Sequence, residues 1–185
     1  MATLQIQVDT VVGQVKLSRV LEAVKPAALL KGFGGRFLSY VNKQFRTRGE
    51  GQWRPLSPLT LLLRRHGGDM PLRDTGKYAQ SFVMETDQRT FVEVGSNLKT
   101  TSGIPLAMIH EYGTAPYTIR ARTAKVLAAK TREGAWIFFG KEVQHPGVPP
   151  RPVLPSKAVA ERLVQEVVDG ALARIEAPGT GRFGG

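Results

Sequence analysis

Hydrophobic and polar positions first alternate with the period of a strand and then recur with that of a helix. Residues 4–8 alternate strictly, which predicts a short first strand, and residues 17–24 have the spacing of a short helix. Pro26 is disfavoured inside a helix but favoured in a first turn, so we expect a second helix to begin there. This helix would bury one apolar stripe, formed by Leu30, Phe33, Phe37, Leu38, Val41 and Phe45.

Three glycines interrupt the second helix, and a long loop follows it. Gly32, Gly34 and Gly35 each cost up to about 1 kcal/mol relative to alanine inside a helix, which weakens the pattern. Residues 46–58 and, later, residues 97–105 lack any apolar period, and turn-forming residues are frequent in both. We therefore expect two loops at these places.

Two short helical turns are predicted after the first of these loops. Ser57 can cap a helix that has Pro58 in its first turn, and we expect this helix to end at Gly67-Gly68. The tripeptide Asp74-Thr75-Gly76 predicts a turn that opens a second helical segment over residues 77–81.

The period then shortens to that of strands. Residues 82–85 and 90–94 are rich in β-branched and aromatic side chains and predict a hairpin. Further strands are expected at residues 117–121 and 135–139. The short apolar segment 107–112 fits either a helix or a strand.

A proline-rich segment and a last helix complete the predicted fold. Residues 144–155 contain five prolines, so we expect them to run extended across the surface. Ser156 then caps an amphipathic helix that ends near Ile175, and residues 177–185 are expected to form a flexible tail. The elements predict an α+β fold, in which an antiparallel sheet is packed by N-terminal and C-terminal helices, within a single domain of residues 1–176.

Composition excludes several classes of protein. The 185 residues are 42% hydrophobic and 22% charged, which is typical of a globular chain. The absence of cysteine excludes disulfides, thiolate nucleophiles and cysteine-ligated metals. There is no apolar run of the roughly 18 residues that a membrane span needs, and we expect neither a span nor a signal peptide.

The formal net charge is +11, and the excess is uneven. Residues 25–65 hold nine cations and one anion, among them Arg46, Arg48, Arg64 and Arg65, which we interpret as a basic face. Such a face attracts nucleic acid or an acidic protein surface, although a solvated face without a partner has the same composition. The chain has none of the usual nucleic-acid-binding signatures.

Candidate catalytic groups lack the partners that their chemistry needs. The tripeptide Asp74-Thr75-Gly76 occurs in aspartic proteases, but cations flank it here and a turn is the better interpretation. His66, His110 and His145 have no metal-ligand spacing, and the His110-Glu111 pair has no accompanying nucleophile motif. We predict no catalytic, cofactor-binding or metal-binding residue, and no enzyme.

The order of the segments is more informative than any one of them. The ordered set is Gly51-Gln52-Trp53-Arg54-Pro55-Leu56-Ser57-Pro58-Leu59-Thr60, Leu72-Arg73-Asp74-Thr75-Gly76-Lys77-Tyr78-Ala79-Gln80-Ser81, Val92-Glu93-Val94-Gly95-Ser96-Asn97, Pro105-Leu106-Ala107-Met108-Ile109-His110-Glu111-Tyr112-Gly113-Thr114 and His145-Pro146-Gly147-Val148-Pro149-Pro150-Arg151-Pro152-Val153-Leu154. The set resembles the virion-morphogenesis, or tail-completion, family of tailed bacteriophages. Residues 123–144 depart from the family pattern, in which the histidine segment leads fairly directly to the arginine-proline segment.

The resemblance implies a structural virion protein of the neck, where head meets tail. Such a subunit would be made in the host cytoplasm and assemble into a ring, with six-fold or twelve-fold symmetry, that bridges the portal or adaptor to the tail tube or tail terminator. It would have no cofactor and no membrane contact, and it could touch DNA. The alternatives are a basic DNA-binding or packaging accessory protein, and a hydrolase built around His110, Glu111 and Asp74.

A ring subunit must present contact elements to its neighbours, and we nominate residues 52–60 and 145–154. The candidate contact residues are Trp53, Arg54, Leu56, Thr60, His110, Tyr112, Pro149, Arg151, Pro152 and Leu154. Trp53 could anchor in a pocket of a partner; alternatively, Trp53 and Leu56 pin the loop to its own core.

Overall fold

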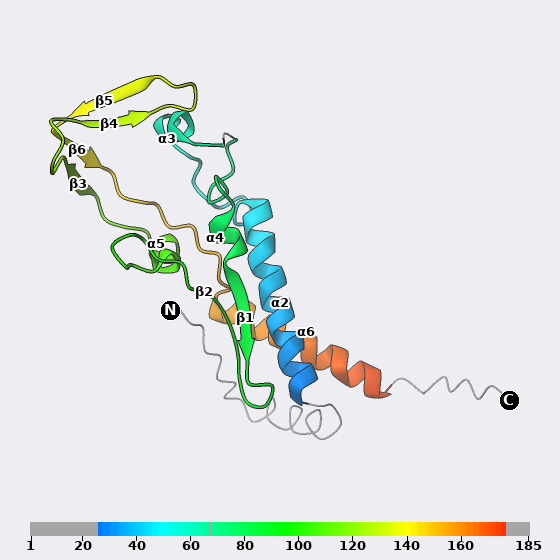
Figure 1. Ribbon diagram of the computed structural model, residues 1–185. Helices are drawn as coiled ribbons and strands as arrows, with labels where there is room; N and C mark the ends of the chain where they lie inside the picture. Colours follow the sequence, from blue (N-terminus) through cyan, green and yellow to red (C-terminus); the bar gives the residue numbers. More distant parts are fainter. Residues whose placement is uncertain (1–25, 67, 177–185) are drawn as a thin grey trace. The chain divides into compact units, whose positions relative to one another are not determined.

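The structure is a computed structural model that describes residues 26–66 and 68–176 (Figure 1). The strand predicted at residues 4–8, the helix at 17–24 and the tail at 177–185 lie outside the described residues. The described fold is α+β. Its elements, in chain order, are α2 (Pro26–Thr47), α3 (Pro58–Leu63), α4 (Lys77–Gln80), β1 (Phe82–Thr86), β2 (Val92–Ser96), α5 (Leu106–Tyr112), β3 (Tyr117–Arg120), β4 (Leu127–Lys130), β5 (Trp136–Gly140), β6 (Glu142–His145) and α6 (Lys157–Glu176).

The described strands form three two-stranded sheets, with the pairs β1-β2, β3-β6 and β4-β5. In the antiparallel pair β3-β6, Tyr117 lies opposite His145 and Arg120 opposite Glu142. In the antiparallel pair β4-β5, Lys130 lies opposite Trp136, and the register shifts between Leu127 and Ala128.

The chain forms two compact units, each made of segments that are distant in sequence. Among the described residues, unit 1 contains residues 41–66, 68–82 and 95–154, and unit 2 contains residues 26–40, 83–94 and 155–176. The single domain expected for residues 1–176 stays a prediction.

Unit 2 packs the first part of α2 and all of α6 around the β1-β2 hairpin. One cluster joins Leu29 of α2 to Val168 and Ala171 of α6, and a second joins Phe37 to Val94 and to Ala160 and Leu163 of α6. This close packing explains two of the three glycines of α2. A β-carbon at Gly34 would meet the side chain of Met84 and lie 2.9 Å from Val92 Cγ2, and one at Gly32 would lie 2.9 Å from Val167 Cγ1.

Unit 1 has an aromatic core. Phe45, near the end of α2, makes edge contacts with Trp53, Tyr78 and Phe82 at ring-centroid distances of 6.0, 5.5 and 5.8 Å. Edge-to-face pairs of this kind add to the free energy gained by burial of the rings. Val41 and Val153 are fully buried in the same unit.

The starts of α2 and α3 are set by local sequence signals, but the predicted end of α3 is wrong. Helix α2 begins at Pro26, as predicted, and Ser57 caps α3 by accepting a hydrogen bond from Thr60 N at 3.1 Å. However, α3 ends at Leu63, before the predicted end at Gly67-Gly68. The reason is tertiary: Arg64 turns inward in an extended conformation and donates to Met70 O at 2.9 Å.

Of the strand predictions, the 82–94 hairpin and the strands near residues 117–121 and 135–139 are confirmed, and β4 and β6 are additional. The segment that fitted either period, residues 107–112, lies in the helix α5. Helix α6 begins after Ser156, as predicted.

The proline-rich segment has no helix or strand between residues 146 and 156, a stretch that we term the arm. As expected, this segment lies at the surface, where Pro150 and Pro152 are exposed, but it is partly embedded, because Arg151 is only 6% exposed and Val153 is fully buried. Prolines remove backbone donors without excluding burial, and the remaining donors of the arm find acceptors in unit 1.

Candidate functional site

The arm docks on the rest of unit 1 through three hydrogen bonds that run in both directions. The indole Nε1 of Trp53 donates to Pro152 O at 3.1 Å, and the guanidinium of Arg151 donates to Arg54 O from Nε at 3.3 Å and from Nη2 at 3.0 Å. Each of the two adjacent pairs, Trp53-Arg54 and Arg151-Pro152, therefore supplies one side chain and one carbonyl. This arrangement fixes the register of the arm against the loop that follows α2.

A left-handed turn sets the position of Trp53. Arg48, Gly49 and Glu50 have φ angles of 56°, 63° and 57°, and Trp53 N donates to Arg48 O at 3.0 Å. A β-carbon on Gly49 would collide with the indole of Trp53, so this position needs glycine for space as well as for its φ.

The second attachment of the arm is the carboxylate of Glu111, at the end of α5. Its Oε1 accepts hydrogen bonds from Val153 N at 2.7 Å and from Leu154 N at 3.0 Å. Burial raises the pKa of this carboxyl, and the two backbone donors oppose the increase. Glu111 thus satisfies two donors of an irregular segment that has no sheet partner.

His110 lies on the aromatic core and supports the arm through its backbone. His110 O accepts from Arg151 N at 2.6 Å, while its ring lies 4.9 Å, centroid to centroid, from the ring of Tyr78. Burial, together with the positive charge of Arg151, lowers the pKa of His110 to about 4, so the imidazole is neutral near pH 7.

Burial is also the main cause of the pKa shifts of Tyr78 and Arg151. Burial and the negative charge of Glu111 raise the pKa of the Tyr78 phenol, and burial and the charge of Arg54 lower the pKa of Arg151. Tyr78 Oη and His110 Nδ1 have no hydrogen-bond partner among the described residues. Most of the polar contacts of this cluster run to the backbone of its own chain, so the arrangement holds the arm in place.

The predicted contact residues therefore separate into buried and exposed groups. Trp53, 5% exposed, and Arg151 are internal, so the alternative in which Trp53 pins the loop to its own core describes this structure, and Trp53 is not presented to a partner. Partly buried positions are Leu56, His110, Pro149 and Leu154. Exposed positions are Arg54, Thr60, Tyr112 and Pro152.

The predicted basic face is smaller than the sequence suggested. Arg64 is 6% exposed and lies 3.5 Å from Asp74 Oδ1, so its assignment to a surface face is wrong. Asp74 also accepts from His66 N and Arg65 N, which lowers its pKa together with the charge of Arg64. Arg48 pairs with Asp69 at 2.7 Å, and Arg46 and Arg65 are exposed.

Unit 1 exposes a set of hydrophobic side chains, of which sequence reasoning named Tyr112 and the segment that contains Leu59 but missed the others. Tyr112, Phe138 and Trp136 are 77%, 67% and 59% exposed. Helix α3 has no buried residue, and its Leu59, Leu61 and Leu62 are all exposed. The signal was present in the run of five consecutive apolar residues at 135–139, which a strand covered on one face does not need.

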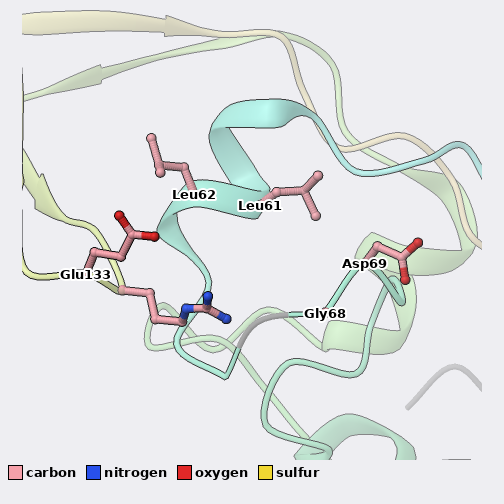
Figure 2. A pocket seen from close by; sticks show the side chains of 6 residues that line it. Leu61, Leu62, Gly68, Asp69 and Glu133 are labelled. Atoms are coloured by element: carbon pink, nitrogen blue, oxygen red, sulfur yellow. The ribbon is translucent and has the colours of Figure 1, made fainter.

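A pocket of about 440 Å³ lies between α3 and the turn of the β4-β5 hairpin, and Leu61 and Leu62 are the members of this set that line it. Figure 2 shows Leu61 and Leu62 extending from α3, with Glu133 on one side and Asp69 on the other. Arg132 N donates to Leu62 O at 3.4 Å, which links the hairpin turn to the helix. The lining is mixed, with two leucines and three charged residues.

The described ranges contain no group of three or more His, Asp or Glu side chains that could hold a metal ion. None of the helices in the part of the chain that the structure describes is long and apolar enough to cross a membrane. No family model matches the chain, and comparisons with curated proteins and with solved structures found no match.

Proposed function

We propose that this chain is a structural subunit of the head–tail neck of a tailed bacteriophage, of the tail-completion type, which assembles into a ring and catalyses no reaction. The observation that carries the proposal is the number of large hydrophobic side chains that unit 1 exposes, namely Leu59, Leu61, Leu62, Ile104, Met108, Tyr112, Tyr117, Val126, Trp136 and Phe138.

Exposed side chains of this kind favour an assembly role. Single apolar residues on a surface are ordinary, but exposed tryptophan, phenylalanine and tyrosine in one unit are the residue types that concentrate at protein–protein contacts. Trp136 and Phe138 leave more than half of their surface in water, and burying them against a partner would be favourable.

Helix α3 supports the same conclusion. It has six residues, caps itself through Ser57 and buries none of its side chains. An isolated helix of this length is far too short to be stable by propensity alone. Its leucines gain apolar contacts if a neighbouring subunit covers them.

The order of the motifs supports the proposed location. Their resemblance to the tail-completion family supports a place between the portal or adaptor and the tail tube or terminator, in a ring with six-fold or twelve-fold symmetry. A head-to-tail contact of one subunit with the next closes such a ring when its rotation divides a full turn.

The alternative of a DNA-binding or packaging accessory protein has less support. This alternative depends on an exposed basic face. However, Arg64 is buried, and Arg48 forms a salt bridge with Asp69. Contact of the ring with DNA that passes through it is compatible with the proposal.

The test is the assembly state of the full-length chain over a wide range of concentration, by native mass spectrometry and negative-stain electron microscopy. The expected result is a discrete closed ring, and labelling should locate the chain at the neck of purified particles. A chain that is monomeric at high concentration and absent from the particle would contradict the proposal. Duplex DNA affinity that falls steeply with salt, without a ring, would support the alternative.

A further inference from the structure

The β4-β5 hairpin has one face that is apolar and exposed. In its register Phe138 lies opposite Ala128, and Trp136 lies opposite Lys130. All four residues are exposed, whereas their strand neighbours Ala129, Ile137 and Phe139 are partly buried on the other face. We term Ala128, Lys130, Trp136 and Phe138 the outer hairpin face.

The two-stranded sheet β3-β6 has polar pairs on its exposed side instead. On its exposed side Thr118 donates to Gln144 Oε1 at 2.9 Å, and Arg120 Nε donates to Glu142 Oε2 at 3.1 Å, each pair directly opposite in the register. These polar pairs suit a surface in water. The outer hairpin face has no such pairs, and a two-stranded sheet with an uncovered apolar face is marginally stable in water, so a partner would stabilise it.

Charge restricts the kind of partner. Residues 117–145 contain six cations and two anions. Two copies of the outer hairpin face would bring like charges together, which disfavours a symmetric contact of this face with itself. The complementary surface is therefore apolar in its centre and acidic at its rim.

The chain itself has such a surface on the β1-β2 hairpin. Val83 and Phe91 are 46% and 49% exposed, and Glu85 is exposed on the side of β1 opposite Met84, which packs into the core of unit 2. Residues 82–93 contain three anions and one cation.

The turn of this hairpin is held rigidly. The carboxylate of Asp87 accepts from the backbone N–H groups of Arg89, Thr90 and Phe91 at 2.9, 2.8 and 3.0 Å. Thr86 Oγ1 donates to Phe91 O at 2.6 Å. A surface ordered before contact loses less entropy on binding.

We propose that the outer hairpin face of one copy docks on Val83, Glu85 and Phe91 of the next copy, with Lys130 facing Glu85. The contact is heterologous, so its repetition closes a ring when the rotation from one copy to the next divides a full turn, and it would be the subunit contact of the proposed assembly. It rests on the proposed function, because it requires that copies of the chain assemble.

The first test removes the apolar centre. The double variant Trp136→Gln, Phe138→Gln should raise the concentration needed for ring formation by at least about tenfold, while the unfolding midpoint of the monomer stays at the wild-type value. The matched control is the double variant Thr118→Ala, Gln144→Ala on the polar two-stranded sheet β3-β6, which should assemble as the wild type does. Rings that form normally from the glutamine variant overturn the inference.

The second test exchanges charges. Lys130→Glu and Glu85→Lys should each impair assembly alone, because each places like charges across the contact. An equimolar mixture of the two single variants should restore rings in which the variants alternate, since every contact then joins opposite charges. The double variant Lys130→Glu, Glu85→Lys should assemble by itself.

The outcomes separate this inference from the proposed function. A wild-type chain that forms no ring contradicts both. Rings that persist in every variant, or mixtures of well-folded variants that do not recover, contradict only the subunit contact. A single-stranded oligonucleotide bound by the wild type and lost in the glutamine variant would show a nucleic-acid stacking surface and would also overturn the inference.

Discussion

The indole of Trp53 and the carbonyl of Pro152, 99 residues apart in the chain, are joined by a hydrogen bond of 3.1 Å. The next residue along, Arg54, offers its carbonyl to the guanidinium of Arg151, the residue before Pro152. Because the indole bond and the two guanidinium bonds run in opposite directions between adjacent residues, a shift of the arm by one position breaks all three. The two side chains thus define where the arm lies.

The reciprocal bonds predict an energetic coupling between Trp53 and Arg151. Trp53→Phe removes the indole donor and part of the packing, and should lower the free energy of unfolding by about 1–2 kcal/mol. Arg151→Met removes the donors to Arg54 O. In a double-mutant cycle measured by urea unfolding, the two changes should couple by at least about 0.5 kcal/mol.

The control for this cycle is Tyr112→Phe, which also removes a polar group from an aromatic ring, at a side chain that is 77% exposed. It should change the free energy of unfolding by less than about 0.5 kcal/mol. Additive effects of Trp53→Phe and Arg151→Met would mean that the loop and the arm are held independently.

Glu111 should govern whether residues 153 and 154 stay docked. Glu111→Ala leaves two buried backbone donors without an acceptor and should destabilise the chain by about 2–4 kcal/mol. Glu111→Gln keeps one oxygen acceptor and should lose less than half as much. Hydrogen exchange of the Val153 and Leu154 amides provides the local measurement, and protection that is unchanged in the alanine variant would contradict this role.

Local signals were enough to predict several elements. Helix α2 begins at a proline, α3 has a serine cap, and the hairpin of β1 and β2 has a dense β-branched and aromatic composition, so each is encoded by its own residues. Strand β4 was missed because Leu-Ala-Ala-Lys favours a helix by propensity, and its pairing with β5 overrides that preference.

The sequence predicts several residues of the candidate site, but not the groups with which they form hydrogen bonds. The order of the segments points to Trp53 and Arg151 as candidates. Nothing in either segment indicates that Trp53 bonds to the carbonyl of Pro152, or Arg151 to that of Arg54. Likewise, the proline content predicted an extended arm, whereas its burial depends on Glu111, 42 residues before Val153. Tertiary acceptors of this kind leave no periodic trace in the sequence.

The glycines of α2 provide a matched pair for stability. Gly35 has open space where a β-carbon would lie, so Gly35→Ala should stabilise the chain by about 0.5–1 kcal/mol through helix propensity. Gly34→Ala has the same propensity gain but places a methyl group against Met84 and Val92, and should be destabilising by about 1–3 kcal/mol in total. Thermal unfolding of both variants provides the comparison. A stabilised Gly34→Ala variant would show that α2 packs less closely on the hairpin than described.

His110 should make the chain sensitive to acid. Its pKa is lowered by burial from 6.5 to about 4, so between these values the unfolded state binds more protons than the folded state. The contribution of His110 to stability is therefore fully present above pH 6.5 and is lost as the pH falls through about 4. Glu111 has the opposite sign, because its raised pKa contributes stability that is present below the unfolded pKa and lost as the pH rises through the folded one.

The variant His110→Phe isolates the histidine, because it keeps a ring against Tyr78 and removes the titrating group. Between pH 6.5 and pH 4.5 the wild type should lose about 1–2 kcal/mol more than this variant in urea unfolding. His66→Asn, at an exposed position, is the control and should follow the wild type. Equal acid sensitivity of His110→Phe and the wild type would mean that the imidazole becomes protonated without unfolding, and that the aromatic core of unit 1 admits water beside Tyr78.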